Sequence, residues 1–358
     1  MKKKIITAYL RYANRSASVR QRFLEYENEL HINNYILEKK SLFSDKYFIG
    51  KIINSKLLLF SVIISCFKRI IQVLFQKKVN LIIIQGELLP YFPNLLERLI
   101  YFKKIPFILD IDDAFFHRYD NSKSLIVKFL LKKKFKFIFS KSKTVFAGSK
   151  YLKEYAIKNG AKNVIFLPTG VNCKKYDKFS SIKKNDTFSI VWIGSPSTTQ
   201  YIIDILPPLN FVCLNNEAII RLIGAKEIQT NYLPLESFEW SEQNEIYLIN
   251  QCHLGIMPLS NNNWEKGKCG FKIIQYFASG IPVIASPVGA NNQIVEHGKN
   301  GFLASTKEDW IKYINFFKNN PNELKSYGIN ARKKVKEIYS TEVLKKKFLQ
   351  NIISVDQN

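Results

Sequence analysis

Short apolar runs alternate along this chain with longer stretches in which apolar residues recur every three or four positions. The first pattern is typical of a parallel strand buried on both faces, and the second of an amphipathic helix. In the first half of the chain, the predicted strands are Lys4–Leu10, Leu81–Ile84, Pro106–Leu109, Thr144–Ala147 and Val164–Leu167. The predicted helices are Val19–Leu30, Leu57–Phe75, Pro93–Tyr101 and Lys150–Lys158. This alternation predicts an open α/β layer.

The pattern breaks at Pro168-Thr169-Gly170, and residues 174–186 are polar and irregular. It then restarts with the predicted strands Phe188–Ile193, Ile219–Ile223, Gly255–Met257 and Pro282–Ala285. We therefore predict an α/β protein of two domains, residues 1–170 and 187–335, joined by a linker at 171–186. Residues 336–358 are predicted to form a helix that packs back toward the first domain. Ligands of open α/β sheets bind at the carboxyl ends of the strands, so we expect the two domains to face each other across a cleft there.

The most informative segment runs from Trp264 to Leu303 and reads as loop, helix, strand, loop, helix and turn. Its loop, Lys-Cys-Gly-Phe-Lys, opens a helix at Ile273 that ends at Ser279-Gly280. The start of a helix presents backbone N–H groups and the positive end of the helix dipole. The segment therefore predicts a phosphate-binding site, and a nucleotide-type ligand is the first hypothesis.

A second loop of this kind, Ser195-Pro196-Ser197-Thr198, follows one predicted strand and precedes a helix at Thr199–Leu206. Its hydroxyls could bind a diphosphate, or could simply cap the helix. Lys266, Lys268 and Lys272 surround the first loop and could offset charge on a leaving diphosphate. They could equally be solvated surface lysines. Lys268 and Lys272 are the stronger candidates because they flank Gly270.

Three aspartates follow the predicted strand Pro106–Leu109, namely Asp110, Asp112 and Asp113. An Asp-x-Asp pair could bind a divalent metal, or an aspartate could act as the general base for an acceptor hydroxyl. The alternative is that one of them caps the next helix. His117 is a possible cleft residue, although a lone histidine is more often structural.

The first predicted helix carries Arg20 and Arg22 in its first turn. An arginine facing a cleft could bind a phosphate or carboxylate, so Arg20 is a candidate acceptor- or phosphate-binding residue. A surface arginine is the alternative. The four histidines show no metal-type spacing, and we expect no metal site and no cofactor.

Residues 123–143 place Val127, Leu131, Phe135 and Ile138 at helical spacing, with lysines over much of the remaining surface. A basic amphipathic helix of this type predicts contact with an anionic membrane surface, and packing against a core is the alternative. The longest apolar run, residues 57–67, is too short to span a bilayer and predicts a buried or interfacial helix.

The net charge of +25 favours an anionic partner, although a lysine-rich codon bias also explains part of it. The five cysteines are scattered without a Cys-x-x-Cys pair, which fits a reducing cytoplasm. No signal peptide is expected, because the apolar run near the amino terminus is short.

Residues 270–303 resemble the carboxyl-domain signature of the family 4-like glycosyltransferases of the GT-B fold, also called glycosyl transferases group 1. Ala278-Ser279-Gly280-Ile281-Pro282-Val283 fits the family's Ala-x-Gly-x-Pro-Val. Further segments are similar to a bacterial surface-polysaccharide branch of that group. These segments are QGELLPYFPNLLERL, DIDDAFFHRYD, VFAGSKYLKEYA, FLPTGVN and IVWIGSPST.

The resemblance implies two Rossmann-like domains, with the amides of Gly270, Phe271 and Lys272 holding the donor diphosphate and sugar. Gln275 stands where the family has a glutamate that bonds the ribose. Gly267 stands where the family has a first glutamate, and the usual Lys-Gly pair is replaced by Ser195-Pro196-Ser197-Thr198. The family's catalytic-region His-Asp aligns with Asp112-Asp113, and Lys268 or Lys272 is expected to supply the missing positive charge.

The expected function is therefore transfer of a sugar from a nucleotide diphosphate donor to a lipid-linked bacterial glycan such as lipopolysaccharide, capsule or O-antigen. The resemblance implies a retaining, metal-independent reaction by a cytoplasmic enzyme on the inner face of the plasma membrane. The alternatives are a metal-dependent transferase that uses Asp110 and Asp112, a non-catalytic glycan-binding relative, and a nucleic-acid-binding protein. No recognised nucleic-acid module supports the last of these.

Overall fold

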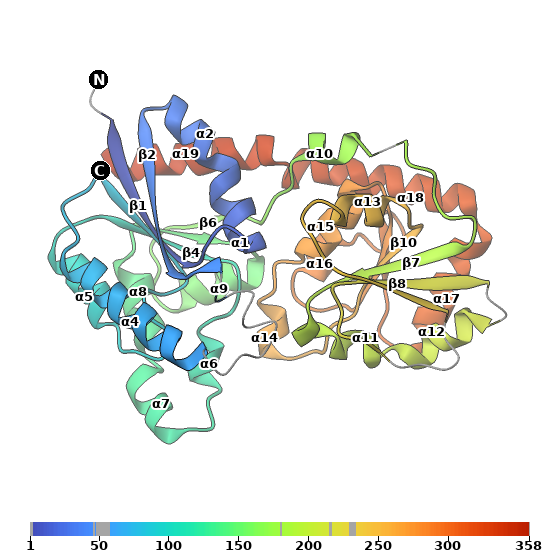
Figure 1. The fold of residues 1–358 in the computed structure, drawn as a ribbon, viewed down its shortest axis with the longest axis horizontal. Coiled ribbons are helices and arrows are strands. Elements are labelled where there is room, and N and C mark those ends of the chain that lie inside the picture. Colours follow the sequence, from blue (N-terminus) through green and yellow to red (C-terminus); the bar gives the residue numbers. More distant parts are fainter. Residues whose placement is uncertain are drawn as a thin grey trace. The chain divides into compact units, whose positions relative to one another are not determined.

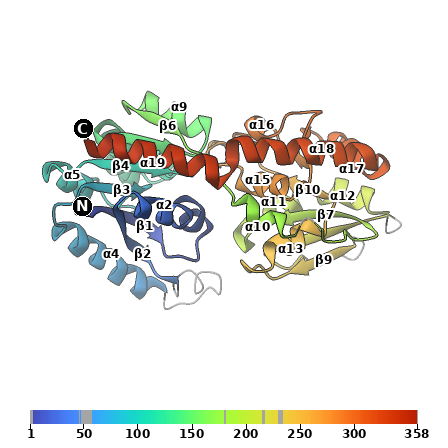
Figure 2. The ribbon, with the colours of Figure 1, turned by 90° about the horizontal axis from the view of Figure 1, so that it is seen from above.

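Two parallel β-sheets form the framework of the computed structural model, which describes residues 3–45, 47, 58–179, 181–214, 217–228 and 234–357. The chain divides into two units, drawn in Figures 1 and 2. The first unit comprises Met1–Thr169, Lys266–Cys269 and Leu344–Asn358, and the second comprises Gly170–Glu265 and Gly270–Val343. The first boundary between the two units therefore falls between Thr169 and Gly170, and residues 171–186, which were predicted to be a linker, belong to the second unit.

The sheet of the first unit has the strand order β2-β1-β3-β4-β5-β6, with every neighbouring pair parallel. Its strands are β1 (Lys4–Tyr12), β2 (Tyr35–Phe43), β3 (Leu81–Gln85), β4 (Phe107–Ile111), β5 (Thr144–Ala147) and β6 (Val164–Phe166). Strands β3, β4 and β5 are fully buried, as expected for parallel strands that are covered on both faces.

Helices cover both faces of this sheet. The first part of the chain forms α1 (Ala17–Val19), the π-helical turn η1 (Arg20–Leu24), α2 (Glu25–Ile32), α4 (Leu58–Leu74) and α5 (Leu95–Phe102). The later helices are α6 (His117–Asp120), α7 (Leu125–Leu131), α8 (Lys134–Lys141) and α9 (Lys150–Lys158). The last helix of the chain, α19 (Thr341–Gln357), contributes Phe348 and Ile352 to the same core as Val19, Phe23 and Phe146.

The second sheet has the order β12-β11-β10-β7-β8-β9 and is also parallel. Its strands are β7 (Phe188–Ile193), β8 (Ala218–Ile223), β9 (Leu235–Phe238), β10 (Leu254–Met257), β11 (Val283–Ala285) and β12 (Gly301–Leu303). The connecting helices begin with α10 (Cys173–Asp177), η2 (Pro196–Thr198), α11 (Gln200–Ile203), α12 (Leu206–Val212), α13 (Glu245–Asn250) and α14 (Asn263–Lys266). They continue with α15 (Phe271–Ala278), α16 (Asn291–Ile294), α17 (Lys307–Asn319), α18 (Pro321–Lys334) and the π-helical turn η4 (Val335–Tyr339).

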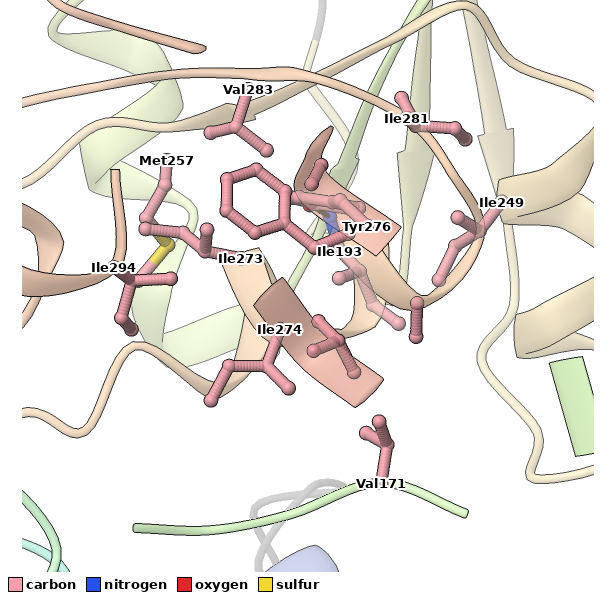
Figure 3. Close-up of a cluster of buried hydrophobic side chains, with 14 of the residues drawn as sticks. Val171, Ile193, Ile249, Met257, Ile273, Ile274, Tyr276, Ile281, Val283 and Ile294 are labelled. Carbon is pink, nitrogen blue, oxygen red and sulfur yellow. Dashed lines mark hydrogen bonds between the residues drawn. The ribbon is translucent and has the colours of Figure 1, made fainter. Parts of the chain in front are cut away.

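Helix α15 is the central helix of one face of this sheet. Figure 3 shows Ile273, Ile274 and Tyr276 pointing into a cluster that includes Ile193 of β7 and Val283 of β11. All of these side chains are buried. The apolar residues whose spacing predicted this helix are therefore the ones that pack it against the sheet. This packing holds the amino-terminal turn of α15 beside the sheet.

The predicted strands are confirmed, with ends shifted by no more than two residues. Strands β2, β9 and β12 were not expected, and residues 174–186 are not wholly irregular, because α10 occupies Cys173–Asp177. The helix predicted at 19–30 is interrupted by η1. Residue 57, where the next helix was predicted to begin, lies outside the described residues.

The prediction of one continuous basic helix over residues 123–143 is wrong. The structure divides it into α7 and α8, and Leu131, Phe135 and Ile138 are buried in the first unit. Lys134 is also buried, and its ammonium donates to the carboxylate of Glu87 at 2.6 Å. The α8 part therefore packs against the core and cannot present its apolar face to a membrane.

Candidate functional site

The start of α15 is shaped by a glycine in a left-handed conformation. Gly270 precedes the helix with φ of 66°, which is a conformation that favours glycine. A Cβ at this position would also lie 2.4 Å from Cδ1 of Ile294, so a larger residue would have to push that side chain aside. The backbone can thus turn sharply and direct the first N–H groups of the helix, those of Phe271 and Lys272, outward from its amino-terminal end.

The first turn of α15 lies against the carboxyl end of β7. The Tyr276 hydroxyl accepts a hydrogen bond from the backbone N–H of Ile193 at 2.8 Å. One turn earlier, the Lys272 ammonium lies 4.3 Å from the centroid of the Trp192 ring. A Cβ on Gly194 would lie 2.1 Å from this ring, so the glycine makes room for the indole. Lys272 is therefore held by a cation–π contact beside the loop that follows β7.

That loop contains the predicted hydroxyl cluster. The backbone N–H of Ser195 donates to the Thr198 hydroxyl at 3.0 Å, and the Ser195 and Ser197 hydroxyls are also 3.0 Å apart. Ser195 and Ser197 are exposed. The hydroxyls thus stabilise the turn, as one interpretation of the sequence expects, and they remain exposed, so diphosphate binding stays a prediction. The structure brings this loop and the Lys272 side chain to one edge of the second sheet.

A cavity of about 400 Å³ opens at the same edge, where β10 and β11 end. It is lined by loop residues after these strands, such as Ser260 and Ser286, by Tyr201 of α11 and Asp204 directly after it, and by Trp310 of α17. Polar and apolar groups together suit a ligand with both a ring and hydroxyl groups.

A further carboxylate lies beside this cavity, and sequence reasoning missed it. Glu265 is 5% exposed, and one of its oxygens accepts a hydrogen bond from the Tyr201 hydroxyl. The other oxygen, Oε2, has no hydrogen-bond partner among the described residues. Leaving a buried carboxylate oxygen unpaired is costly, so this atom is suited to accept a bond from a ligand. The signal in the sequence was an acidic residue two positions before Gly267.

Gln275 is placed differently from the expected ribose contact. Its side chain is buried at 3% exposure and hydrogen-bonded to the Tyr176 hydroxyl. Burial, above all, raises the pKa of Tyr176 beyond its usual range. In this structure the amide therefore ties α15 to α10 inside the second unit.

In the first unit, Asp110 is part of a buried bidentate ion pair with Arg22. The guanidinium donates to both carboxylate oxygens, with the Nε–Oδ2 distance at 2.9 Å, and also to the Leu167 carbonyl at 2.9 Å. Both side chains are almost fully buried. Because both oxygens of Asp110 are engaged, Asp110 is a poor metal ligand. In the described part of the chain, no three His, Cys, Asp or Glu side chains gather into a metal-binding group.

Asp112 and Asp113, at the end of β4, are only half-buried. The Ser18 hydroxyl donates to the Asp112 carboxylate, and the Cys269 thiol donates to the Asp112 carbonyl at 2.9 Å. Burial and the neighbouring Asp112 carboxylate raise the pKa of Asp113 to about 7, against the opposing charge of Lys268. A carboxylate with a pKa near neutrality is suited to general-base chemistry.

Arg20 and His117 are both built into the first unit. The Arg20 guanidinium donates to the carbonyl of Arg15, and the residue is 8% exposed. The His117 ring bonds the Tyr151 hydroxyl at 2.7 Å through Nε2, and its Nδ1 lies 3.4 Å from the Asp120 carboxylate. The His117 contacts position the start of α6, and the Arg20 contact holds the loop before η1. The structure adds no direct sign of a ligand at either residue.

Comparisons with known proteins agree with this architecture. The family model described as Glycosyl transferases group 1 matches residues 215–334, which include Glu265, Gly270 and α15. An uncharacterised glycosyltransferase of Methanocaldococcus jannaschii is 24% identical over 238 residues, which is 64% of this chain. The match spans 60% of that protein's length.

Solved structures show the same fold at low identity. HepE of Anabaena, solved with UDP and glucose, superposes with a TM-score of 0.70 at 12% identity, covering 98% of this chain and 100% of that one. A glycosyltransferase of Rickettsia africae gives a TM-score of 0.70 at 16% identity over the whole of both chains. A sucrose-phosphate synthase of Thermosynechococcus elongatus gives 0.67 at 13% identity and 99% coverage of each. These structures confirm the GT-B fold of two Rossmann-like α/β domains, and the family model confirms the resemblance of residues 215–334 to group 1.

Proposed function

From a GT-B fold whose residues 215–334 match the glycosyl transferases group 1, we propose that this protein transfers a sugar from a nucleotide diphosphate donor to a glycan. One observation carries the proposal. The Lys272 ammonium, the Ser195–Thr198 hydroxyls and the amino-terminal end of α15 gather at the carboxyl edge of the second sheet. A cation, hydroxyl donors and a helix start are together suited to a diphosphate.

In the proposed reaction, the diphosphate is the leaving group. Lys272 and the first N–H groups of α15 offset the charge that builds on it as the bond to the sugar breaks, and no metal ion is needed for this. The orphan oxygen of Glu265 accepts a bond from a hydroxyl of the donor sugar and so orients it. This contact replaces the one that the family's first glutamate makes, which Gly267 cannot supply.

The acceptor hydroxyl loses a proton as it attacks. Asp113, whose pKa is raised to about 7, is the proposed base, and the donor phosphate itself can assist in a retaining reaction. Asp112 and Lys268 position and tune Asp113. Arg20 and His117 remain candidates for contact with the acceptor. The engagement of Asp110 by Arg22 supports a metal-independent reaction over one that uses an Asp110/Asp112 metal site.

The proposed acceptor is a lipid-linked bacterial surface glycan, such as a precursor of lipopolysaccharide, capsule or O-antigen. The proposed location is the cytoplasmic side of the plasma membrane, with the protein held peripherally. Support comes from the similarity of the segments quoted above to a surface-polysaccharide branch and from the net charge of +25. In the part of the chain that the structure describes, every helix is too short or too polar to cross a bilayer.

Donor binding is tested by thermal shift against UDP, GDP, CDP and their common sugar conjugates. UDP is tested first, because solved structures of HepE hold UDP, UDP with glucose, or UDP-glucose. We expect one nucleotide class to stabilise the protein strongly, with and without EDTA. A protein that no nucleotide stabilises, and that hydrolyses none of the conjugates, would refute the proposal.

A further inference from the structure

Helix α4 exposes many of its large apolar side chains and buries a different side, which carries Arg69 and Val73. Phe60, Phe67 and Phe75 are 71%, 64% and 78% exposed. The exposed residues, which we call the α4 face, are Leu59, Phe60, Ile63, Ile64, Phe67, Ile71, Leu74 and, directly after the helix, Phe75. They recur every three or four positions and so lie along one side of the helix. A helix on the surface of a soluble protein normally has the opposite orientation, with its apolar side chains facing the core.

The orientation of α4 is fixed by a buried arginine. Arg69 is 1% exposed, and its guanidinium donates to the carbonyls of Leu10 at 2.8 Å and Lys40 at 2.9 Å. The same guanidinium lies 4.8 Å from the centroid of the Tyr9 ring. Turning the apolar side inward would expel this charge from its hydrogen bonds and leave the two carbonyls unpaired.

The end of α4 is held as well. The Lys103 ammonium donates to the carbonyls of Val73 at 3.1 Å and Leu74 at 2.6 Å, and Val73 is fully buried. A lysine at the carboxyl end of a helix also complements the helix dipole. The exposure of the α4 face is therefore built into the first unit.

Helix α7 repeats this exposure. Phe129 is 89% exposed and Leu125 is 81% exposed, and both Ile126 and Leu130 are exposed too. Figure 1 draws α7 projecting from the body of the first unit. This part of the predicted basic helix, unlike α8, keeps these four apolar side chains in solvent.

The charges around both helices have one sign. The sequence contains no acidic residue between Asp45 and Glu87, or between Asp120 and Glu154. Exposed lysines accompany each helix: Lys68, Lys77 and Lys78 at α4, and Lys128, Lys132, Lys133 and Lys136 at α7 and just after it. Two copies of this chain joined through these surfaces would bring like charges together, whereas an anionic lipid surface complements them.

We propose that the α4 face and α7 dock the first unit onto an anionic lipid bilayer, with their apolar side chains at the boundary between head groups and acyl chains. Their lysines pair with the lipid head groups. The inference rests on the proposed function for its biological setting, since a lipid-linked acceptor lies in such a surface. The docking itself does not depend on donor binding.

The test is co-sedimentation of the full chain with vesicles of phosphatidylcholine mixed with phosphatidylglycerol, and with vesicles of phosphatidylcholine alone. We expect binding to the anionic vesicles, weaker binding to the neutral ones, and loss of part of the binding as salt is raised. The double variant Phe60→Ser/Phe67→Ser should lower the partition coefficient by about tenfold or more, because both rings leave the interface. Leu125→Ser/Phe129→Ser should have a similar effect.

The matched control is Phe211→Ser/Ile329→Ser, which removes two exposed apolar side chains of the second unit and should leave binding unchanged. Wild-type protein that ignores anionic vesicles, or an α4 double variant that binds like wild type, would overturn the proposal. So would variants that turn a dimer into a monomer without affecting vesicle binding, since a second copy would then be the occupant. Thermal shifts with UDP on the same variants separate a failure of the docking proposal from a failure of the proposed function. Stabilisation by UDP without vesicle binding would refute only the docking.

Discussion

The Lys272 ammonium lies 4.3 Å from the centroid of the Trp192 ring, which joins the first turn of α15 to the end of β7. The contact fixes a long, flexible side chain in the place where a diphosphate is proposed to bind. A cation that is already ordered loses less conformational entropy when a ligand arrives. Trp192 therefore serves as a platform, and Gly194 leaves the space that the indole fills.

Lys272→Ala should weaken the binding of UDP by about tenfold or more, because a charge-assisted contact to phosphate contributes roughly 1.5–3 kcal/mol. Affinity for uridine, which carries no phosphate, should hardly change. Isothermal titration with both ligands measures the difference. Lys312→Ala is the matched control, because the Lys312 ammonium also lies over a ring, that of Tyr313, at 5.6 Å. Equal affinity of wild type and Lys272→Ala for UDP would remove Lys272 from the site.

Glu265→Gln should leave the stabilisation by UDP unchanged and reduce the additional stabilisation by the cognate UDP-sugar. The reason is that the orphan oxygen is proposed to meet the sugar, and a hydrogen bond to a charged group is worth about 1.5–3 kcal/mol. Transfer activity should fall with it. Glu236→Gln, which alters a carboxylate that is 42% exposed, is the control. If the UDP-sugar stabilises Glu265→Gln beyond UDP by as much as it does wild type, the carboxylate only anchors Tyr201.

Asp110→Asn should destabilise the first unit by about 3–5 kcal/mol, because it leaves the Arg22 charge buried without its partner. Donor binding and transfer should be insensitive to EDTA. Asp177→Asn is the comparison: its carboxylate is 55% exposed and pairs with Arg332, so the loss should be about 1 kcal/mol or less. Urea unfolding measures both. Activity that EDTA abolishes and Mn²⁺ restores, together with normal stability of Asp110→Asn, would favour the metal-dependent alternative.

Asp113 should make stability fall as pH rises. Its pKa is raised from 3.8 to about 7, so the folded protein holds this proton more tightly than the unfolded chain does. The stabilising contribution is complete below 3.8 and is lost as pH rises to about 7. In Asp113→Asn, the decrease in the free energy of unfolding between pH 3.8 and about 7 should be smaller by on the order of 1 kcal/mol, a value that allows for solvent screening.

The transfer rate should move in the opposite direction, rising to a plateau above pH 7 as Asp113 becomes a competent base. Glu154→Gln, at an exposed position in α9, should leave both profiles unchanged. Identical pH profiles for wild type and Asp113→Asn would assign the base to another group, such as the donor phosphate.

The sequence pattern was most informative where strands are buried on both faces. Strands β3, β4, β7 and β10 are mostly apolar and almost wholly buried, and each was predicted within two residues. Strand β2 was missed because it is an edge strand, where Glu38, Lys39 and Lys40 interrupt the apolar pattern. Strand β12 is only three residues long and begins at a glycine, which gives little periodicity to detect.

The site was predicted less completely than the fold. The two phosphate-type loops could be found because their hydroxyl, glycine and lysine residues are local in sequence. The Arg22–Asp110 pair could not, because 88 positions separate its partners and only the sheet topology joins them. The inward position of Gln275 and the orphan oxygen of Glu265 depend on packing between elements, which a single sequence does not display.

Helix α19 has a consequence for how this protein is made. Phe348 and Ile352 complete the core around Val19, Phe23 and Phe146, although the whole second unit, Gly170–Glu265 and Gly270–Val343, is synthesised between the two sets. On a ribosome, where amino-terminal domains ordinarily fold first, the core of the first unit stays incomplete until α19 emerges. The domain that is translated first is thus the last to be finished, and loss of the final helix would leave it without part of its interior.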